Sequence, residues 1–173
     1  QFQVTGTSPL ICHKWSEKAK KAMRDKQTKR ATGPKEAKDP QADFEASLYR
    51  TSDGGYGFPA VAFKAAAIRA AKSVNGLTMT DARQMFHVFA DDGDLVRIKG
   101  EPTMREDMVR LNGQTADIRY RGEFRDWSAT LTVQYNADII SDEQLANLFE
   151  LAGFSVGVGE WRVEKGGSFG QFT

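Results

Sequence analysis

Apolar and polar positions alternate most regularly in the segment WSATLTVQY, residues 127–135. Its apolar positions are Trp127, Ala129, Leu131, Val133 and Tyr135. A period of two residues is typical of an antiparallel strand with one buried face. A β pattern extends over residues 95–135 and includes the charged segments MREDMVRL and TADIRYR. This part of the chain is therefore predicted to be a series of antiparallel strands.

Shorter β patterns occur toward both ends of the chain. Residues 2–11 predict a strand interrupted near Ser8-Pro9, because an interior proline favours an edge or a bulge. The segment FEASLYRTSDGGYGFP, residues 44–59, predicts a hairpin that turns at Asp53-Gly54-Gly55. Near the C-terminus, FSVGVGEW and FGQFT each predict a further strand.

Two helices are predicted in the first half of the chain. Ser16 is a suitable cap for a helix that runs to about Thr28 and has little apolar content. Such a helix buries little surface, so tertiary packing contributes little to its stability. Pro59 suits the first turn of a second helix over residues 60–72, which is apolar nearly all round and is expected to pack on a sheet.

Two more helices are predicted by their caps. Thr80 is expected to cap a helix whose apolar face holds Ala82, Met85, Phe86 and Phe89. Ser141 and Gln144 form a capping box, and Gly153 is expected to end the helix that follows. That helix is predicted to bury Leu145, Leu148, Phe149 and Ala152.

The order of these elements mixes antiparallel strands with helices and predicts the α+β class. The favoured architecture is a single RRM-like domain over residues 1–173. It would be built as a ferredoxin-like antiparallel sheet with helices and a basic insertion after the first strand.

Charge is distributed unevenly along the chain. Residues 14–38 hold ten Lys/Arg and three Asp/Glu, a local charge of +7, whereas the whole chain carries +1. The remainder is therefore acidic. Residues 14–42 are predicted to form a basic helix followed by a mobile loop over residues 27–42, which contains Gly33-Pro34 and Asp39-Pro40. The insertion is either a solvated face or a surface that becomes ordered on nucleic acid or on a neighbouring subunit.

Several classes of protein are disfavoured by composition. Cys12 is the single cysteine, so an intrachain disulfide is impossible, and one cysteine with two histidines disfavours a zinc site of the usual ligands. The chain has no run of 18 apolar residues, which argues against a membrane span. It starts at Gln1 without Met, so a preceding segment is not excluded; a cytoplasmic location, without a membrane partner, is the expectation.

Catalytic and metal-binding signals are weak. His13 follows the first strand but has no acid–base partner at a recognisable spacing. His87 is interpreted as a helix-surface or core histidine. The pair Asp39 and Asp43 and the run Asp91-Asp92-Gly93-Asp94 are more typical of turns than of metal sites. No cofactor, no metal and no enzymatic activity are therefore predicted.

The segment GVGEWRVEKGGSFGQF, residues 157–172, combines glycines with an aromatic residue and charges. Glycines let backbone N–H groups approach a phosphate or a sugar, while Arg162 and Lys165 supply charge and Trp161 a stacking face. The alternative is a solvated hairpin whose glycines serve only tight turns.

Three features together resemble the RAMP superfamily, the repeat-associated RRM-like proteins of CRISPR systems. The segment YGFPAVAFKAAAIRAA, residues 56–71, resembles the segment of CRISPR backbone subunits in which a proline-containing turn leads into a helix with a Lys and an Arg, here Lys64 and Arg69. Residues 157–172 resemble the RAMP glycine-rich loop, and Gly-Ser-Phe-Gly at 167–170 is similar to its ending. The α+β order with a basic insertion after the first strand is the third feature. The chain is short for a backbone subunit, so the resemblance implies a compact relative from a phage or another mobile element.

The resemblance implies a non-catalytic protein that binds single-stranded DNA or RNA and assembles head to tail along the strand as a homo-oligomeric filament. The residues expected to bind nucleic acid are Lys14, Lys18, Lys21, Arg24, Lys64, Arg69, Arg119, Arg121, Trp161, Arg162 and Lys165. For the arginines at 105, 110, 119 and 121, cross-strand pairing with acids is the competing interpretation. Two alternatives remain: an assembly protein that forms homo-oligomers without nucleic acid, and an endoribonuclease that uses His13.

Overall fold

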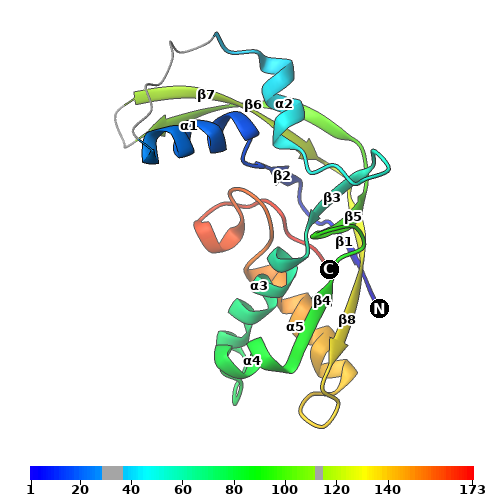
Figure 1. Ribbon diagram of the computed structural model, residues 1–173. Coiled ribbons are helices and arrows are strands. Elements are labelled where there is room, and N and C mark those ends of the chain that lie inside the picture. The colour runs from blue at the N-terminus through cyan, green and yellow to red at the C-terminus, as the bar shows by residue number, and fades with distance from the viewer. Residues whose placement is uncertain (29–36, 112–114) are drawn as a thin grey trace.

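The computed structural model describes residues 1–28, 37–111 and 115–173, and it shows an α+β protein with antiparallel sheets (Figure 1). The strands are β1 (Phe2–Thr5), β2 (Leu10–Cys12), β3 (Tyr56–Pro59), β4 (Phe86–Phe89), β5 (Leu95–Lys99), β6 (Pro102–Leu111), β7 (Thr115–Phe124) and β8 (Ser128–Tyr135). The helices are α1 (Glu17–Gln27), α2 (Pro40–Ser47), α3 (Ala60–Ala70), α4 (Met79–Met85) and α5 (Asp142–Ser155), with short 3₁₀ turns η1 (Ala71–Ser73) and η2 (Val163–Lys165).

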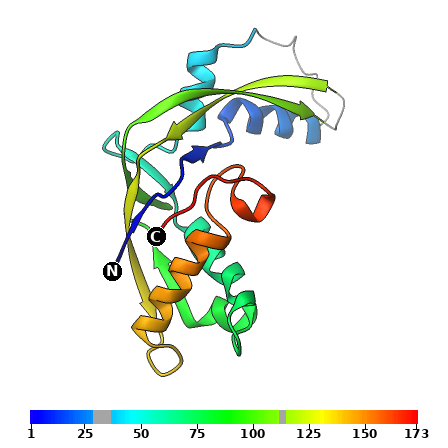
Figure 2. The same cartoon turned by 180° about the vertical axis from the view of Figure 1, so that it is seen from behind.

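The larger sheet has the order β1-β8-β5-β3, with β4 paired to β8. Its helices α3, α4 and α5 lie together on one side of it (Figures 1 and 2). The alternation predicted for β8 is confirmed, since Trp127, Ala129 and Leu131 are buried and point into the core. Phe63 of α3 and Phe149 of α5 belong to the same core, so this sheet and its helices hold most of the buried apolar surface.

The smaller sheet has the order β2-β7-β6 and carries the long β6–β7 hairpin away from the first sheet (Figure 1). Its ten residue pairs run from Pro102 opposite Phe124 to Leu111 opposite Thr115. Helix α2 packs on β7, and Ser47 accepts a hydrogen bond from the backbone N–H of Gly122 at 2.8 Å. The interruption predicted near Ser8-Pro9 is confirmed, because β1 and β2 lie in different sheets.

Helix α1 forms where its cap predicts it. The hydroxyl of Ser16 accepts a hydrogen bond from Ala19 N–H at 3.1 Å, and Thr28 follows the last turn. None of its residues is buried, as its composition predicts. Half of the mobile loop predicted over residues 27–42, residues 29–36, lies outside the described residues. The loop prediction is wrong at Gln27, the last residue of α1, and at residues 40–42, which begin α2.

The predicted hairpin over residues 44–59 is wrong at residues 44–47, which belong to helix α2. Asp39 caps this helix through Ala42 N–H at 3.1 Å, and Pro40 occupies the first helical position. The predicted turn is confirmed, since Thr51 N–H donates to Gly55 carbonyl and Gly54 has a φ of 84°.

The helix predicted from Thr80 is shorter than expected and has a different cap. Thr78 and Asp81 form the capping box of α4, and the helix ends at Met85. Phe86 and Phe89 lie in strand β4 instead, because pairing with β8 satisfies their backbone there. His87 is therefore exposed on a strand and not on a helix.

The strand predicted over residues 154–161 is wrong. Helix α5 continues through Gly153 to Ser155, and a Cβ at Gly153 would lie 1.8 Å from the carbonyl oxygen of Phe172. The expected end of the helix at Gly153 is thus also wrong. Because Gly153 has no Cβ, the terminal segment can pack directly against the helix at this position.

The strand predicted over residues 169–173 is reduced to isolated bridges, of Phe169 with Arg162 and of Phe172 with Gly6, because Gly170 bends the chain between them. Thr173 and Thr5 exchange backbone hydrogen bonds at 2.9 and 3.0 Å beside β1.

The glycines of the terminal loop serve close contacts within the chain itself. A Cβ on Gly170 would lie 1.7 Å from the carbonyl oxygen of Val158, and one on Gly167 the same distance from that of Trp161. A Cβ on Gly159 would lie 2.7 Å from the carbonyl oxygen of Ile11. The loop therefore closes the fold by packing backbone on backbone and against β2.

Two glycine variants test this. Gly166 and Gly170 both have left-handed φ, 79° and 68°, but a Cβ on Gly166 meets nothing within 4 Å. We expect Gly166→Ala to cost about 1–2 kcal/mol of unfolding free energy, the backbone term alone. Gly170→Ala should cost more than about 3 kcal/mol, because its methyl group overlaps a carbonyl. Urea unfolding measures both, and equal losses would contradict the packing role of Gly170.

Candidate nucleic-acid interface

A groove of about 540 Å³ lies between α1, α2 and β7. Its lining is basic and aromatic on several sides: Lys14 and Trp15 come from the segment before α1, Lys38 from the residue before the α2 cap, and Arg119 and Tyr120 from β7. Trp15 is 58% exposed. Cations that attract phosphates and a ring on which a base can stack therefore share one groove.

Acidic groups reduce the positive charge of this groove without cancelling it. Asp43 and Asp117 also line it, and the ammonium group of Lys38 lies against the Asp117 carboxylate and the Ile118 carbonyl. Arg119 lies 3.8 Å from the same carboxylate. Lys14 extends over the ring of Tyr49 at 6.0 Å and is exposed.

The cations of α1 divide between two sides of the helix. Ala19, Ala22 and Met23 line the groove, whereas Lys21 and Arg24 lie around a separate surface hollow with the end of the helix. By the period of 3.6 residues, Lys18 lies nearer the second side. Of the α1 residues predicted to bind nucleic acid, none lines the groove.

His13 joins this groove to a second cavity of about 290 Å³. The second cavity lies between Pro59 and Arg69 of the segment around α3 and the residues 157–160 and 162 of the terminal loop. The two segments that resemble RAMP motifs thus meet, on opposite sides of one cavity, beside the end of β2.

The imidazole of His13 has a charged partner on each side. Arg119 Nη1 lies 3.3 Å from Nε2, and because a guanidinium only donates hydrogen bonds, Nε2 is the accepting nitrogen. The proton of the neutral ring is then on Nδ1, which lies 3.7 Å from the Glu160 carboxylate. Burial lowers the pKa of His13, Arg121 lowers it further, and Glu160 opposes them.

Charged residues on the hairpin face toward the terminal loop. Arg105 donates to Asp107 at 2.9 Å and to Glu123 at 2.7 Å, and Arg121 lies 3.5 Å from Asp107. Arg121 is only 4% exposed, and its Nε lacks a hydrogen-bond partner among the described residues. The cross-strand pairing predicted as the competing interpretation is confirmed for Arg105, which pairs with Glu123, and for Arg121, which pairs with Asp107. Arg119 instead lies near Asp117 on its own strand.

Trp161 covers this charged cluster. The guanidinium groups of Arg105 and Arg121 lie 5.4 and 5.2 Å from the centre of its ring, a cation–π arrangement. Its φ of 50° is unusual for a residue with a side chain, and the close fit of Gly167 against its carbonyl accompanies that backbone. The ring therefore contacts protein cations on the inside of the loop.

The remaining predicted residues are dispersed. Arg69 and Arg162 share the Glu164 carboxylate, at 2.9 and 3.1 Å, and thereby tie α3 to the terminal loop. Lys165 is exposed on η2. Lys64 lies 3.1 Å from Nδ1 of His87, on the part of α3 that packs near β4.

Other reactive groups give no competing site. Burial raises the pKa of the Cys12 thiol to about 12, so it stays protonated near neutral pH. Among residues 1–28, 37–111 and 115–173, no three His, Cys, Asp or Glu residues are grouped so that they could hold a metal ion. No helix in the described part of the chain is long and apolar enough to cross a bilayer.

Comparison with known proteins does not identify a family for this chain. The chain has no significant match among protein-family models, curated protein sequences or solved structures.

Sequence reasoning missed Trp15, Lys38 and Tyr120. Trp15 had a usable signal, because an aromatic residue between a strand end and a helix cap, next to Lys14, is well placed for exposure. The sequence gives no such signal for Lys38 and Tyr120, because these residues come together only when α2 packs against β7.

The lowered pKa of His13 predicts a pH dependence of stability. The unfolded chain binds a proton at the ordinary pKa of 6.5, whereas the folded chain binds it only at lower pH. Stability is therefore complete above 6.5 and falls as the pH drops below it. Thermal unfolding from about pH 7.5 to about pH 5.5 should show this loss in the wild type and in the His87→Gln control.

In His13→Gln the loss over the same range should be smaller. A pH dependence identical to that of the wild type would show that His13 is not the group that titrates.

Proposed function

We propose that this chain is a non-catalytic single-stranded nucleic-acid-binding protein that assembles along the strand. The observation that carries the proposal is the groove between α1 and β7, in which exposed Trp15 lies among Lys14, Lys38 and Arg119. Stacking on an aromatic ring needs only the π face of a base, and phosphate contacts carry no sequence information. Binding with little sequence preference follows from this chemistry.

The same proposal includes an RRM-like fold and a relationship to the RAMP superfamily. An antiparallel sheet with α3 and α5 on one face supports an RRM-like core, with residues 14–42 as an insertion. The meeting of the α3 segment and the terminal loop at one cavity supports a relationship to the RAMP superfamily. Neither segment needs to bind the strand directly, since Arg69, Arg162 and Trp161 are engaged with protein groups.

Binding is best tested with a short fluorescent single strand. We expect affinity to fall with salt, with a log–log slope of roughly −3 or steeper, as for several phosphate contacts. Trp15→Ala should weaken binding about five- to 150-fold, the range for loss of one stacked base. Phe89→Ala is the matched control, because Phe89 is 48% exposed on β4, outside the groove.

Lys14→Ala should weaken binding and make the salt slope less steep, whereas Lys72→Ala on η1 should change neither. Thermal unfolding should be nearly unchanged in all four variants, because these side chains are exposed. A salt-independent affinity, or equal effects of Trp15→Ala and Phe89→Ala, would remove the groove as the binding site.

An endoribonuclease is the second candidate, because the structure gives His13 a carboxylate neighbour that its sequence spacing did not reveal. Against it, Nε2 of His13 already faces a guanidinium, so the basic nitrogen is occupied. We expect no cleavage of a labelled RNA strand by the purified protein. Cleavage that is lost in His13→Ala and retained in His87→Ala would replace the proposed function with the enzymatic one.

A further inference from the structure

The outer side of α1, which carries Lys21 and Arg24, faces away from the groove. No residue of α1 is buried, and the groove uses only its other side. The outer side carries Lys21, Arg24 and one acid, Asp25, and Lys20 lies next to it. Glu17 pairs with Lys20 at 2.7 Å and with Arg24 at 3.8 Å, which leaves the helix as a whole with an excess of positive charge.

Helix α5 has the opposite character. Its 14 residues include Asp142, Glu143 and Glu150 and no Lys or Arg. Glu143, Asn147, Glu150 and Phe154 follow one another at helical spacing and are all exposed, so they form one stripe along the helix. Phe154 is 72% exposed, a large apolar surface for a side chain on a helix.

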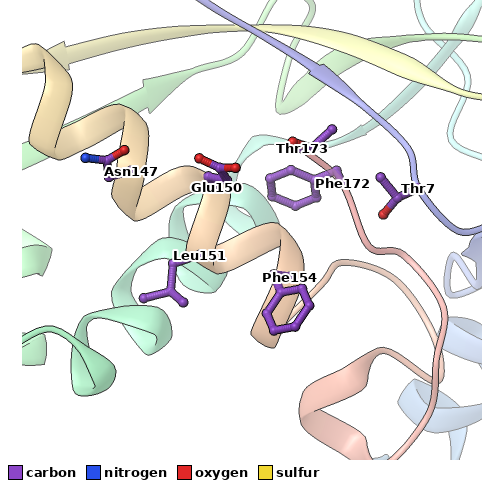
Figure 3. Close-up of a pocket in the computed structure, with 7 residues that line it drawn as sticks. All are labelled: Thr7, Asn147, Glu150, Leu151, Phe154, Phe172 and Thr173. Carbon is purple, nitrogen blue, oxygen red and sulfur yellow. The ribbon is translucent and has the colours of Figure 1, made fainter.

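Part of this stripe borders a cavity. Figure 3 shows Asn147, Glu150 and Phe154 on α5, with Phe172 and Thr173 of the terminal segment across from them. The cavity has a volume of about 440 Å³ and lies at the end of the stripe. An exposed phenyl ring beside a carboxylate provides both the π face and the anion that a guanidinium group binds.

The two faces cannot meet within one copy. Helix α1 lies beside the β6–β7 hairpin, whereas α5 lies under the larger sheet in the other half of the molecule, as both views show (Figures 1 and 2). A contact between them must therefore join two copies, and it uses different surfaces on each. Contacts of this heterologous kind extend into open chains unless their rotation closes a ring.

We propose that the outer side of α1, through Lys21 and Arg24, docks on the Glu143–Glu150–Phe154 stripe of α5 in a second copy of this chain. This inference deepens the assembly part of the proposed function. Docking at these faces leaves Lys14, Trp15 and Arg119 of the groove free to bind the strand. Neighbouring copies then strengthen one another's binding through the docking contact, while each copy keeps its own contacts with the strand.

Charge reversal tests the contact. Sedimentation of the wild type at low salt should show association that increases with protein concentration, increases further on long single strands and decreases with added salt. The variants Glu143→Lys/Glu150→Lys and Lys21→Glu/Arg24→Glu should each associate at least about tenfold more weakly, because like charges then face one another. An equimolar mixture of the two variants should form heterodimers, since each supplies the face that the other lacks.

The control for α5 is Glu101→Lys/Asp126→Lys, which makes the same change in net charge at exposed positions outside both faces. It should associate like the wild type. Circular dichroism confirms that each variant is folded. Wild-type association in the α5 variant, no heterodimer in the mixture, or equal loss in the control would each overturn the docking inference.

Binding of a short strand that holds one copy separates the two proposals. The α5 variant should bind it with wild-type affinity, because α5 is distant from the groove. If wild-type protein binds the short strand but remains a single copy on long strands, docking fails and the proposed binding function stands. If it associates but does not bind the strand, the binding function fails and docking stands.

Discussion

Pairing of charged side chains on the β6–β7 hairpin determines how the terminal loop packs on this hairpin. The register places Arg105 opposite Arg121, with Asp107 beside them, on a face that the terminal loop covers. A buried guanidinium is stable only with compensating groups, and Asp107, nearly as buried as Arg121, supplies one. The ring of Trp161 provides another, and this contact holds the loop in place. Where the loop then packs against its own backbone, only glycine fits, because a Cβ would overlap a carbonyl oxygen.

The groove exists because strand β7 extends well beyond the end of its neighbour β2. Strand β2 pairs only with Gly122–Phe124, so residues 117–120 of β7 have α1 and α2 beside them instead of another strand. Because the charged face of the hairpin is committed to the loop, the residues at this open edge and on the insertion remain for a ligand. His13, at the end of β2, lies where the two regions meet.

Local signals in the sequence predicted the α+β class, strand β8, helix α1 and the capping box of α5, because alternation and caps depend on neighbours in the chain. Helix α2 was missed although Asp39-Pro40 is a good helix start, since the same residues also begin turns. Phe86 and Phe89 were placed on a helix, because a short apolar run fits either period and only pairing with β8 decides. The role of the terminal glycines and the position of Trp15 depend on contacts between distant segments, which a single sequence does not specify.

Photocrosslinking tests the central claim, that the groove holds the strand, most directly. A short single strand of iodouracil nucleotides, which holds one copy, would be irradiated with the protein, and the crosslinked residues identified by mass spectrometry. The groove predicts crosslinks at Trp15 and Tyr120, which it exposes to a stacked base. Crosslinks confined to Phe154 on α5 or to Trp161 would contradict the account.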